Sequence, residues 1–193
     1  MRDGRVLATL YSDFNCPFCH ALGLRLSALG RDDAVCWKGV QHAPELPIPM
    51  ADADPTLARA LIDEVAAVRD LMPEAPIALP RGKPNTGPAI ALVAAAARQD
   101  PGRAETLRGV LYNAFWQDGA DISDPDPLIR LATESGLSAD TLDRDAGRAD
   151  AERWQHEWMR TGLGCVPLLL RRDGRALPGL VDDDALRAFL APA

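Results

Sequence analysis

Apolar positions near the start of the chain predict a strand, a helix and a second strand. Residues 6–14 are mostly apolar, carry no helix cap, and predict a buried strand. The apolar positions after Pro17 fit a helix that continues to about Leu29 and ends at Gly30, and proline is favourable at the first position of a helix. Residues 34–40 predict the second strand. This order is the beginning of a βαβ unit.

The end of the chain predicts a hairpin and one more helix. Residues 166–171 form an apolar stretch, Asp173-Gly174 is a turn signal, and residues 175–177 are expected to pair back. The acidic triplet 182–184 then opens a helix that runs to Leu190, because acidic side chains in a first turn suit the helix dipole. A metal site is the alternative interpretation of this triplet, although acids are ordinary in a first turn.

Helical periodicity dominates the middle of the chain. Apolar residues recur at spacings of three and four in residues 55–72, between two proline-rich loops at 41–54 and 74–88. Asp124 and Ser138 are plausible helix N-caps. Further helices are predicted over residues 89–99, 103–116, 125–135 and 149–160, with a short one near 139–145.

These elements predict an α/β fold with one sheet divided between the two ends of the sequence. At 193 residues, the chain has the length of a large single domain. We expect residues 1–48 and 161–193 to form the core that contains the sheet. Residues 49–160 are then an all-helical insertion that packs on this core.

Charge and hydropathy exclude several classes of partner. The net charge is −7, and Lys and Arg do not cluster on one predicted helix, so neither nucleic acid nor a membrane surface is an expected partner. The longest apolar run, residues 89–97, is too short to cross a bilayer, and the N-terminus lacks the apolar region of a signal peptide. We therefore expect a cytoplasmic protein, in which four cysteines indicate catalysis or metal binding rather than a disulfide framework.

The run Cys16-Pro17-Phe18-Cys19-His20 lies where the first predicted strand gives way to the helix. A cysteine at a helix N-terminus has its thiolate stabilised by free backbone N–H groups and by the helix dipole. Cys16 takes that N-cap position, so its pKa is expected to be lowered, whereas Cys19 lies one turn further in and should be more buried. The pair is a candidate redox dithiol, in which Cys16 forms the mixed disulfide and Cys19 resolves it.

Two other interpretations of the motif are a c-type haem attachment site and a zinc site. Haem would be held by Cys16 and Cys19 with His20 as an axial ligand, but haem attachment normally needs export. Zinc would use Cys16, Cys19, His20 and Cys36, but the sequence has no second half-site of closely spaced Cys or His residues. We therefore expect no metal ion at the motif.

The remaining histidines and one further cysteine are assigned to packing or to the surface. Cys36 lies in the middle of a predicted strand and is expected in the core. His42 lies in a proline-rich loop and His156 on a predicted helix between Trp154 and Trp158, so both are expected to be surface or packing residues rather than catalytic bases.

A second informative feature lies far from the motif in sequence. Val166-Pro167 places a proline at the start of a predicted strand, where it cannot donate a hydrogen bond to the sheet. From the residues alone, a cis bond in a tight turn and an ordinary trans proline are both open.

Together these residues resemble the DsbA-type branch of the thioredoxin superfamily, and above all its FrnE-like subgroup, which is related to 2-hydroxychromene-2-carboxylate isomerases. The resemblance extends over nearly the whole chain. It implies a thioredoxin fold (βαβ…ββα) with an all-helical insertion, Cys16 as nucleophile, Cys19 as resolving thiol, and a cis Val166–Pro167 bond beside them. The matching blocks are Ser12-Asp13-Phe14, the Cys16–Cys19 motif, Trp37 with Pro44 and Pro47, Asn85-Thr86, residues 111–119, residues 121–124 and Val166-Pro167.

The resemblance also implies partners and residues that shape the site. The loop at Val166-Pro167 would offer backbone groups to an extended substrate peptide, as an added strand does. Expected partners are protein or peptide thiols and disulfides, or a low-molecular-weight thiol such as glutathione, and no cofactor is expected besides the redox-active disulfide itself. The expected site-shaping residues are Pro17, Phe18, Cys165, Val166 and Pro167.

The sequence departs from the family pattern at two positions. Strongly oxidising periplasmic members have Pro-His between the cysteines, whereas this chain has Pro17-Phe18, and Phe18 supplies no positive charge to a thiolate. Cys165 stands where relatives usually have Gly or Ser. Two roles are open for Cys165: an inert, small buried residue, or a thiol that forms an alternative disulfide near the site.

Two alternatives to a thiol–disulfide oxidoreductase stay open. One is a glutathione-dependent isomerase or transferase, but the isomerase relatives carry Ser in place of the first cysteine, so the presence of both cysteines favours redox chemistry. The other is a redox-sensing, chaperone-like module that binds peptides without catalysing exchange.

Overall fold

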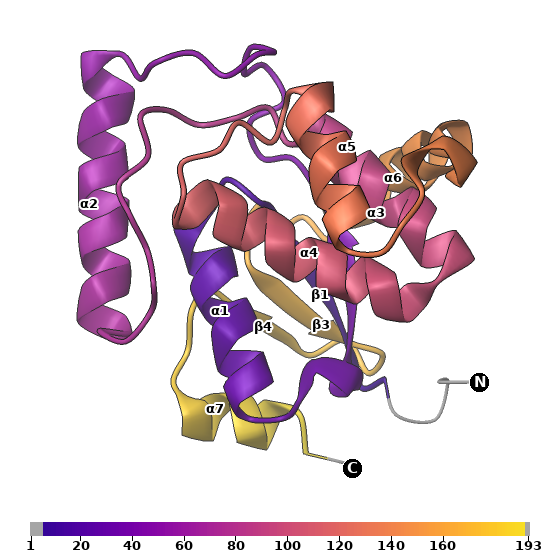
Figure 1. Cartoon of the computed structure of the whole chain (residues 1–193). Coiled ribbons are helices and arrows are strands. Elements are labelled where there is room, and N and C mark those ends of the chain that lie inside the picture. Colours follow the sequence, from indigo (N-terminus) through magenta and orange to yellow (C-terminus); the bar gives the residue numbers. More distant parts are fainter. Residues whose placement is uncertain (1–5, 192–193) are drawn as a thin grey trace.

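The sheet of this protein is assembled from both ends of the chain (Figure 1). The computed structural model describes residues 6–191, and within them the strand order is β2-β1-β3-β4. Strand β1 pairs in parallel with β2 and antiparallel with β3, and β3 pairs antiparallel with β4. This is the α/β thioredoxin fold expected from the sequence. The strands are β1 (Ala8–Ser12), β2 (Val35–Gly39), β3 (Leu168–Arg171) and β4 (Ala176–Pro178).

Helices cover both faces of the sheet. Helices α1 (Pro17–Ala28) and α7 (Asp183–Phe189) share one core with the strands, in which Leu10 of β1 packs with Leu22 of α1 and Leu186 of α7. Helix α6 (Arg144–Met159) lies against the other face, where Trp158 packs with Tyr11 and Leu168. Side chains alternate along each strand, so the neighbouring residues Leu10 and Tyr11 of β1 point to opposite faces. Both are buried, so both faces of the sheet are apolar there.

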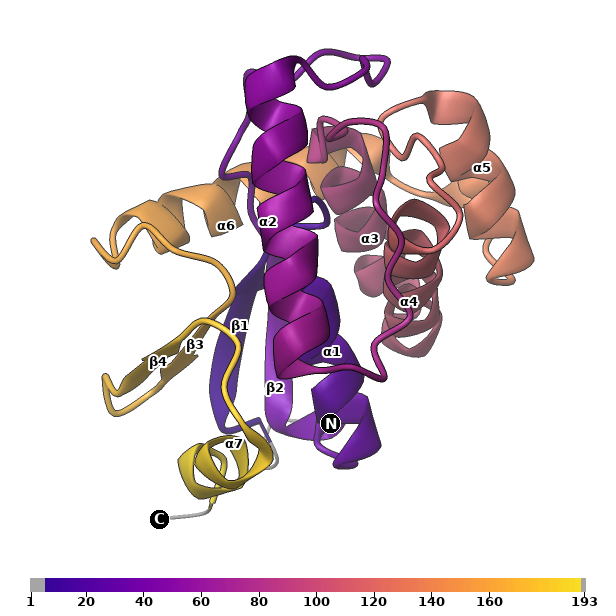
Figure 2. The ribbon, with the colours of Figure 1, turned by 90° about the vertical axis from the view of Figure 1, so that its left-hand side faces the viewer.

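The remaining helices lie between β2 and β3 in sequence. Helix α2 stands at one side of the molecule, apart from α3 to α6 (Figures 1 and 2). Helices α3 and α4 carry much of the largest buried cluster, which also contains both cysteines of the motif. None of the helices within residues 6–191 is both long and apolar enough to cross a membrane. The bounds are α2 (Pro55–Leu71), α3 (Gly87–Gln99), α4 (Pro101–Trp116) and α5 (Pro125–Glu134), with 3-10 turns at Asp32–Ala34 and Ala139–Thr141.

Aspartate side chains cap most of these helices. Asp124 accepts a hydrogen bond from the Asp126 N–H at 3.0 Å, so its prediction as the cap of α5 is confirmed. Ser138 is the residue before the 3-10 turn, but its side chain makes no capping bond. The other capping aspartates, each accepting from backbone N–H groups of its first turn, are Asp54, Asp100, Asp143 and Asp182.

Three helix starts differ from the prediction. Helix α6 begins at Arg144 instead of residue 149, and the short helix expected over 139–145 is a 3-10 turn over Ala139–Thr141. The first turns of α6 are polar and conceal the apolar period, while the Asp143 side chain caps the Ala146 N–H at 2.9 Å. Helices α3 and α4 each begin two residues earlier than expected. Their first turns contain Pro88 and Pro101, because proline is accepted at the start of a helix.

Cys36 is not a core residue, contrary to the prediction. Its side chain is exposed, whereas Val35 beside it is buried with α1 and α7. Because side chains alternate along a strand, Cys36 points to the opposite face of the sheet. Helix α6 covers that face around Tyr11 and Val40 and leaves the part at Cys36 open.

Helices α3 and α6 approach closely at Gly147. A Cβ atom on Gly147 would lie 2.3 Å from the Ala91 carbonyl oxygen and 2.8 Å from the Ala95 Cβ. We predict that Gly147→Ala lowers the free energy of unfolding by about 1–3 kcal/mol, because it overpacks this contact. The measurement is urea unfolding of the variant and of wild type.

Gly109→Ala is the matched control for that substitution. Gly109 is an exposed helical glycine of α4 whose added Cβ would meet no atom within 4 Å. This variant should be more stable than wild type by roughly 0.5–1 kcal/mol, through lower backbone entropy in the unfolded chain. Equal effects of the two substitutions would contradict the close contact of α3 and α6.

Candidate active site

The two cysteines of the motif occupy the start of α1. Cys16 has extended backbone angles and is the N-cap residue, as predicted, and α1 continues from Pro17. The Cys16 carbonyl accepts hydrogen bonds from the N–H groups of Cys19 at 3.1 Å and His20 at 3.3 Å. Cys16 is 6% exposed and Cys19 is 1% exposed, so only Cys16 is open to a substrate sulfur.

The two thiols differ in acidity. The hydrogen bond from the Cys19 thiol lowers the pKa of Cys16, as do the charge of His42 and the backbone of Cys19, against the opposing effect of burial. Burial raises the pKa of Cys19 well above its ordinary value, and the Cys16 sulfur raises it further. Cys16 is therefore the more acidic thiol of the pair, and Cys19 is the thiol that donates to it. The lowered pKa of Cys16 agrees with the prediction from its position at the helix N-terminus, although the hydrogen bond from the Cys19 thiol is the largest cause of the shift.

The late proline loop lies beside the dithiol. As a thiol, Cys16 donates a hydrogen bond to the Val166 carbonyl oxygen at 3.7 Å, across 150 positions of sequence. The Val166–Pro167 peptide bond is cis. The Pro167 carbonyl oxygen accepts from the Gly179 N–H at 2.8 Å, which fixes the loop against the turn after β4. The structure thus brings Cys16, Cys19, Val166 and Pro167 together.

Two other predicted residues lie at the edges of this site. Phe18 is half-buried and packs against the largest apolar cluster. Cys165 is also half-buried and packs with the cluster of Tyr11 and Trp158 under α6. The Trp158 indole N–H donates to the Cys165 carbonyl oxygen at 3.0 Å, so this residue is held on the α6 side of the proline loop.

A buried carboxylate beside the dithiol is the main feature that the sequence analysis missed. Asp13 is fully buried, and its Oδ2 accepts hydrogen bonds from the His42 backbone N–H at 2.9 Å and the His42 Nδ1 at 2.7 Å. Its Oδ1 accepts from the Thr86 hydroxyl at 2.7 Å. Burial lowers the pKa of His42, but the hydrogen bond and charge of Asp13 raise it more, so the net direction is upward.

His42 is therefore neither a plain surface residue nor a packing residue. Its side chain is 32% exposed, its ring is paired with Asp13, and its charge acts on Cys16. The sequence contains a signal for this pairing. Asp13 directly follows β1, and His42 follows the parallel neighbour β2 by three residues, so both lie at the same edge of the sheet. The carboxyl ends of parallel strands lie at the same edge of a sheet, and ligand-binding sites in such sheets are found at that edge.

The loop that carries His42 is held by amides. The Asn85 amide donates to the carbonyl oxygens of Pro44 at 3.0 Å and Leu46 at 2.8 Å, and its Oδ1 accepts from Gln41 Nε2 at 2.8 Å. Asn15, next to Cys16, donates to the Pro84 carbonyl oxygen at 3.1 Å. These bonds fix His42 relative to the start of α1.

Helix α4 supports the other side of the dithiol. The Tyr112 hydroxyl lies 2.7 Å from the Ser12 hydroxyl, and the Trp116 indole N–H donates to the Phe14 carbonyl oxygen at 2.8 Å. His20 stacks on the Tyr112 ring with centroids 5.7 Å apart, and burial lowers the pKa of His20 to about 4. His20 is thus a neutral packing residue at neutral pH. Across the described part of the chain, no three side chains of the Cys, His, Asp and Glu types gather as metal ligands do.

Comparison with known proteins gives one family. The sequence pattern of the DSBA-like thioredoxin domain matches residues 9–191. A sequence comparison with curated proteins finds no match.

Solved structures share the fold over nearly the whole chain. A putative protein disulfide isomerase from Nitrosomonas europaea is 16% identical, with a TM-score of 0.75 over 95% of this chain and 96% of that one. A probable DsbA oxidoreductase from Streptomyces coelicolor is 20% identical, with a TM-score of 0.74 over 94% and 88%. The cytosolic disulfide reductase DsbM from Pseudomonas aeruginosa is 22% identical, with a TM-score of 0.71 over 95% and 96%. A 2-hydroxychromene-2-carboxylate isomerase has the same fold, at 17% identity and a TM-score of 0.65 over 94% and 91%.

The charge of His42 should be measurable at Cys16. We predict that His42→Asn raises the pKa of Cys16, because the imidazolium that Asp13 holds charged favours the thiolate. In wild type this support is present below the raised pKa of His42 and is lost as the pH rises through it. The measurement is a titration of thiolate ultraviolet absorbance in wild type and variant.

His156→Asn is the control, because His156 is an exposed histidine of α6. It removes an imidazole without touching Asp13, and should leave the Cys16 titration as in wild type. A His42→Asn titration that overlays that of wild type would show that His42 does not act on the thiolate.

Proposed function

The chain belongs to the family of DSBA-like thioredoxin domains, and we propose that it is a thiol–disulfide oxidoreductase in which Cys16 and Cys19 are the redox pair. The observation that carries the proposal is the unequal pair itself. Cys16 has a lowered pKa at the N-cap of α1, and Cys19 is a fully buried thiol one turn further in, with a raised pKa. A nucleophile and a resolving thiol need this difference.

The exchange balances over two steps. The Cys16 thiolate attacks one sulfur of a substrate disulfide and releases the other as a thiolate, which takes up a proton. Cys19 then gives up its proton and attacks the Cys16 sulfur, and the second substrate sulfur leaves as a thiol. Two electrons pass from the dithiol to the substrate. The reverse sequence oxidises a substrate dithiol, starting from attack of its thiolate on Cys16 of the disulfide form.

The surroundings of the pair favour attack at Cys16 in both directions. Cys19 is 1% exposed, and its sulfur accepts a hydrogen bond from the Asp13 N–H at 3.4 Å. An incoming sulfur therefore reaches Cys16 first. In the oxidising direction, a low Cys16 pKa also makes Cys16 a good leaving group when the second substrate thiolate attacks the substrate sulfur of the mixed disulfide.

Substrates of this site are protein or peptide thiols and disulfides, or a low-molecular-weight thiol. The carbonyl of Val166 points at the Cys16 sulfur, at 3.7 Å, and backbone groups in this position suit an extended peptide. One of the structures with this fold is the Pseudomonas disulfide reductase with GSH, which supports glutathione as a candidate small thiol. We propose a cytoplasmic location, no metal, and no cofactor other than the Cys16–Cys19 disulfide.

The isomerase alternative is supported by fold alone. A 2-hydroxychromene-2-carboxylate isomerase shares the architecture at 17% identity. A buried second thiol with a raised pKa serves no purpose in an addition of glutathione, whereas it is needed to resolve a mixed disulfide. The dithiol of this chain therefore favours exchange over isomerisation.

Replacing each cysteine in turn separates their roles. We predict that Cys16→Ser reduces insulin reduction to the uncatalysed rate, and that Cys19→Ser accumulates a mixed disulfide at Cys16. Mass spectrometry after digestion locates the bound thiol. Cys36→Ser is the control, because Cys36 is exposed on β2 away from the site, and should retain wild-type activity. Peptide binding without exchange in wild type would instead support a redox-sensing module.

Cys165 is expected to shape the proline loop rather than to exchange. Its side chain packs beside Trp158, and its carbonyl accepts from the Trp158 indole. We predict that oxidised protein contains the Cys16–Cys19 disulfide, with Cys165 still alkylated by a thiol reagent after unfolding. A disulfide that joins Cys165 to Cys16 in the mass map would establish the alternative pairing.

A further inference from the structure

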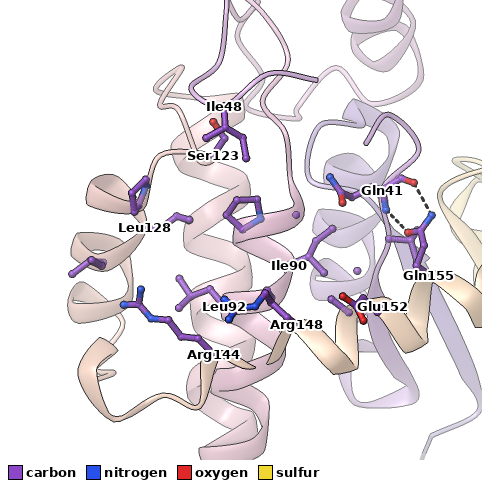
Figure 3. A pocket seen from close by; sticks show the side chains of 18 of the residues that line it. Gln41, Ile48, Ile90, Leu92, Ser123, Leu128, Arg144, Arg148, Glu152 and Gln155 are labelled. Carbon is purple, nitrogen blue, oxygen red and sulfur yellow. Dashed lines mark hydrogen bonds between the residues drawn. The ribbon is translucent and has the colours of Figure 1, made fainter. Parts of the chain in front are cut away.

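A cavity of about 630 Å³ lies outside the dithiol site, in the helical part of the molecule (Figure 3). Its walls come from α3, α5 and α6, from the end of β2 and from the loops that carry Ile48 and Ser123. This volume falls within the range of small-molecule binding pockets. Neither cysteine of the motif lines it, and His42 does not either, so it is not the redox site.

The interior of the cavity is apolar. Ile48 is 54% exposed and Ile129 is 39% exposed, and both are large apolar side chains that an occupant would cover. Covering exposed apolar surface is favourable at any such site. Ile90, Leu92, Leu128 and Ala151 are further apolar residues of the lining.

Positive charge is concentrated at one end. Arg144 and Arg148 are one turn apart on α6, and Figure 3 shows both side chains extending toward α5. Arg148 pairs with Asp145 of its own helix, and Arg144 makes no ion pair within residues 6–191. Glu152 also lines the cavity, but on the side of Arg148 away from Arg144 (Figure 3). The end near α5 therefore has one guanidinium without an ion-pair partner among the described residues, that of Arg144, in a chain whose net charge is −7.

Two other polar residues of the wall, Gln155 and Ser123, already have hydrogen-bond partners. Gln155 accepts from the Gln41 N–H at 2.8 Å and donates to the Gln41 carbonyl oxygen at 2.9 Å. The Ser123 hydroxyl donates to Asp121 at 2.6 Å. His156 also lines the cavity, but only Arg144 and Arg148 carry a guanidinium fork, which matches the planar oxygens of a carboxylate.

We propose that this cavity binds an amphipathic monocarboxylate, a small organic acid with an apolar body. The body lies against Ile48, Ile90 and Leu128, and the carboxylate lies between Arg144 and Arg148. The site is independent of the proposed redox function, because it shares no residue with the dithiol.

The test uses decanoate as the probe and decanol as its uncharged counterpart. Isothermal titration of the full chain should give saturable binding of decanoate with a stoichiometry of one, and weaker binding of decanol. In Arg144→Gln/Arg148→Gln, decanoate should bind at least about tenfold more weakly while decanol is little changed. The matched control is Arg59→Gln/Arg187→Gln, which removes the same charge from exposed positions of α2 and α7 and should behave as wild type.

Filling the cavity gives a second, charge-independent test. Ala151→Phe places a ring in the pocket from α6 and should abolish binding of both probes, with the fold monitored by circular dichroism. Cys16→Ser/Cys19→Ser should bind decanoate as wild type does, which separates this site from the redox function. The proposal is overturned if wild type binds neither probe, if it binds both equally, or if the double arginine variant keeps the decanoate affinity.

Discussion

The carboxylate of Asp13 is the constraint on which the rest of the site depends. A fully buried charge is costly unless hydrogen bonds replace the lost water. Asp13 obtains these bonds from Thr86 at the start of α3 and from the ring and backbone of His42 after β2. Three segments far apart in sequence therefore meet directly behind the Cys16 loop. The burial of this one group fixes the position of the His42 imidazole relative to the dithiol and raises the pKa of that imidazole.

The same arrangement explains how the pKa of Cys16 is lowered without a polar residue between the two cysteines. Phe18 supplies no charge, and it packs into the apolar cluster instead. The positive charge comes from His42, outside the motif, and the strongest support for the Cys16 thiolate comes from the Cys19 thiol. Cys19 in turn remains protonated because it is enclosed by Phe14, Tyr112 and the core around them. The two side chains are chemically identical, so the difference between their pKa values comes from their positions in the fold.

Local features of the sequence predicted the elements that carry the dithiol. An apolar strand followed by proline in a first helical turn is enough to place Cys16 at an N-cap, because both signals are short-range. The Asp13–His42 pairing was missed because it joins residues 29 positions apart, and requires the parallel pairing of β1 and β2 to be known first. Cys36 was misassigned because a strand pattern does not show where a covering helix ends. The first turns of α6 were missed because their polar residues carry no apolar period, although they contain Arg144 and Arg148.

The candidate active site and the cavity lie on the two sides of one segment. Gln41 lines the cavity, and the next residue, His42, is bonded to Asp13. Gln155 of α6 holds the Gln41 backbone through two hydrogen bonds, and the Gln41 side chain is bonded to Asn85, which also holds the loop at Pro44 and Leu46. Helix α6 and Asn85 therefore both hold the residue that precedes His42. The helices between β2 and β3 are accordingly more than a cover for the sheet: α3, α5 and α6 provide most of the cavity lining, and Gln155 and Asn85 provide the bonds that position the segment of His42.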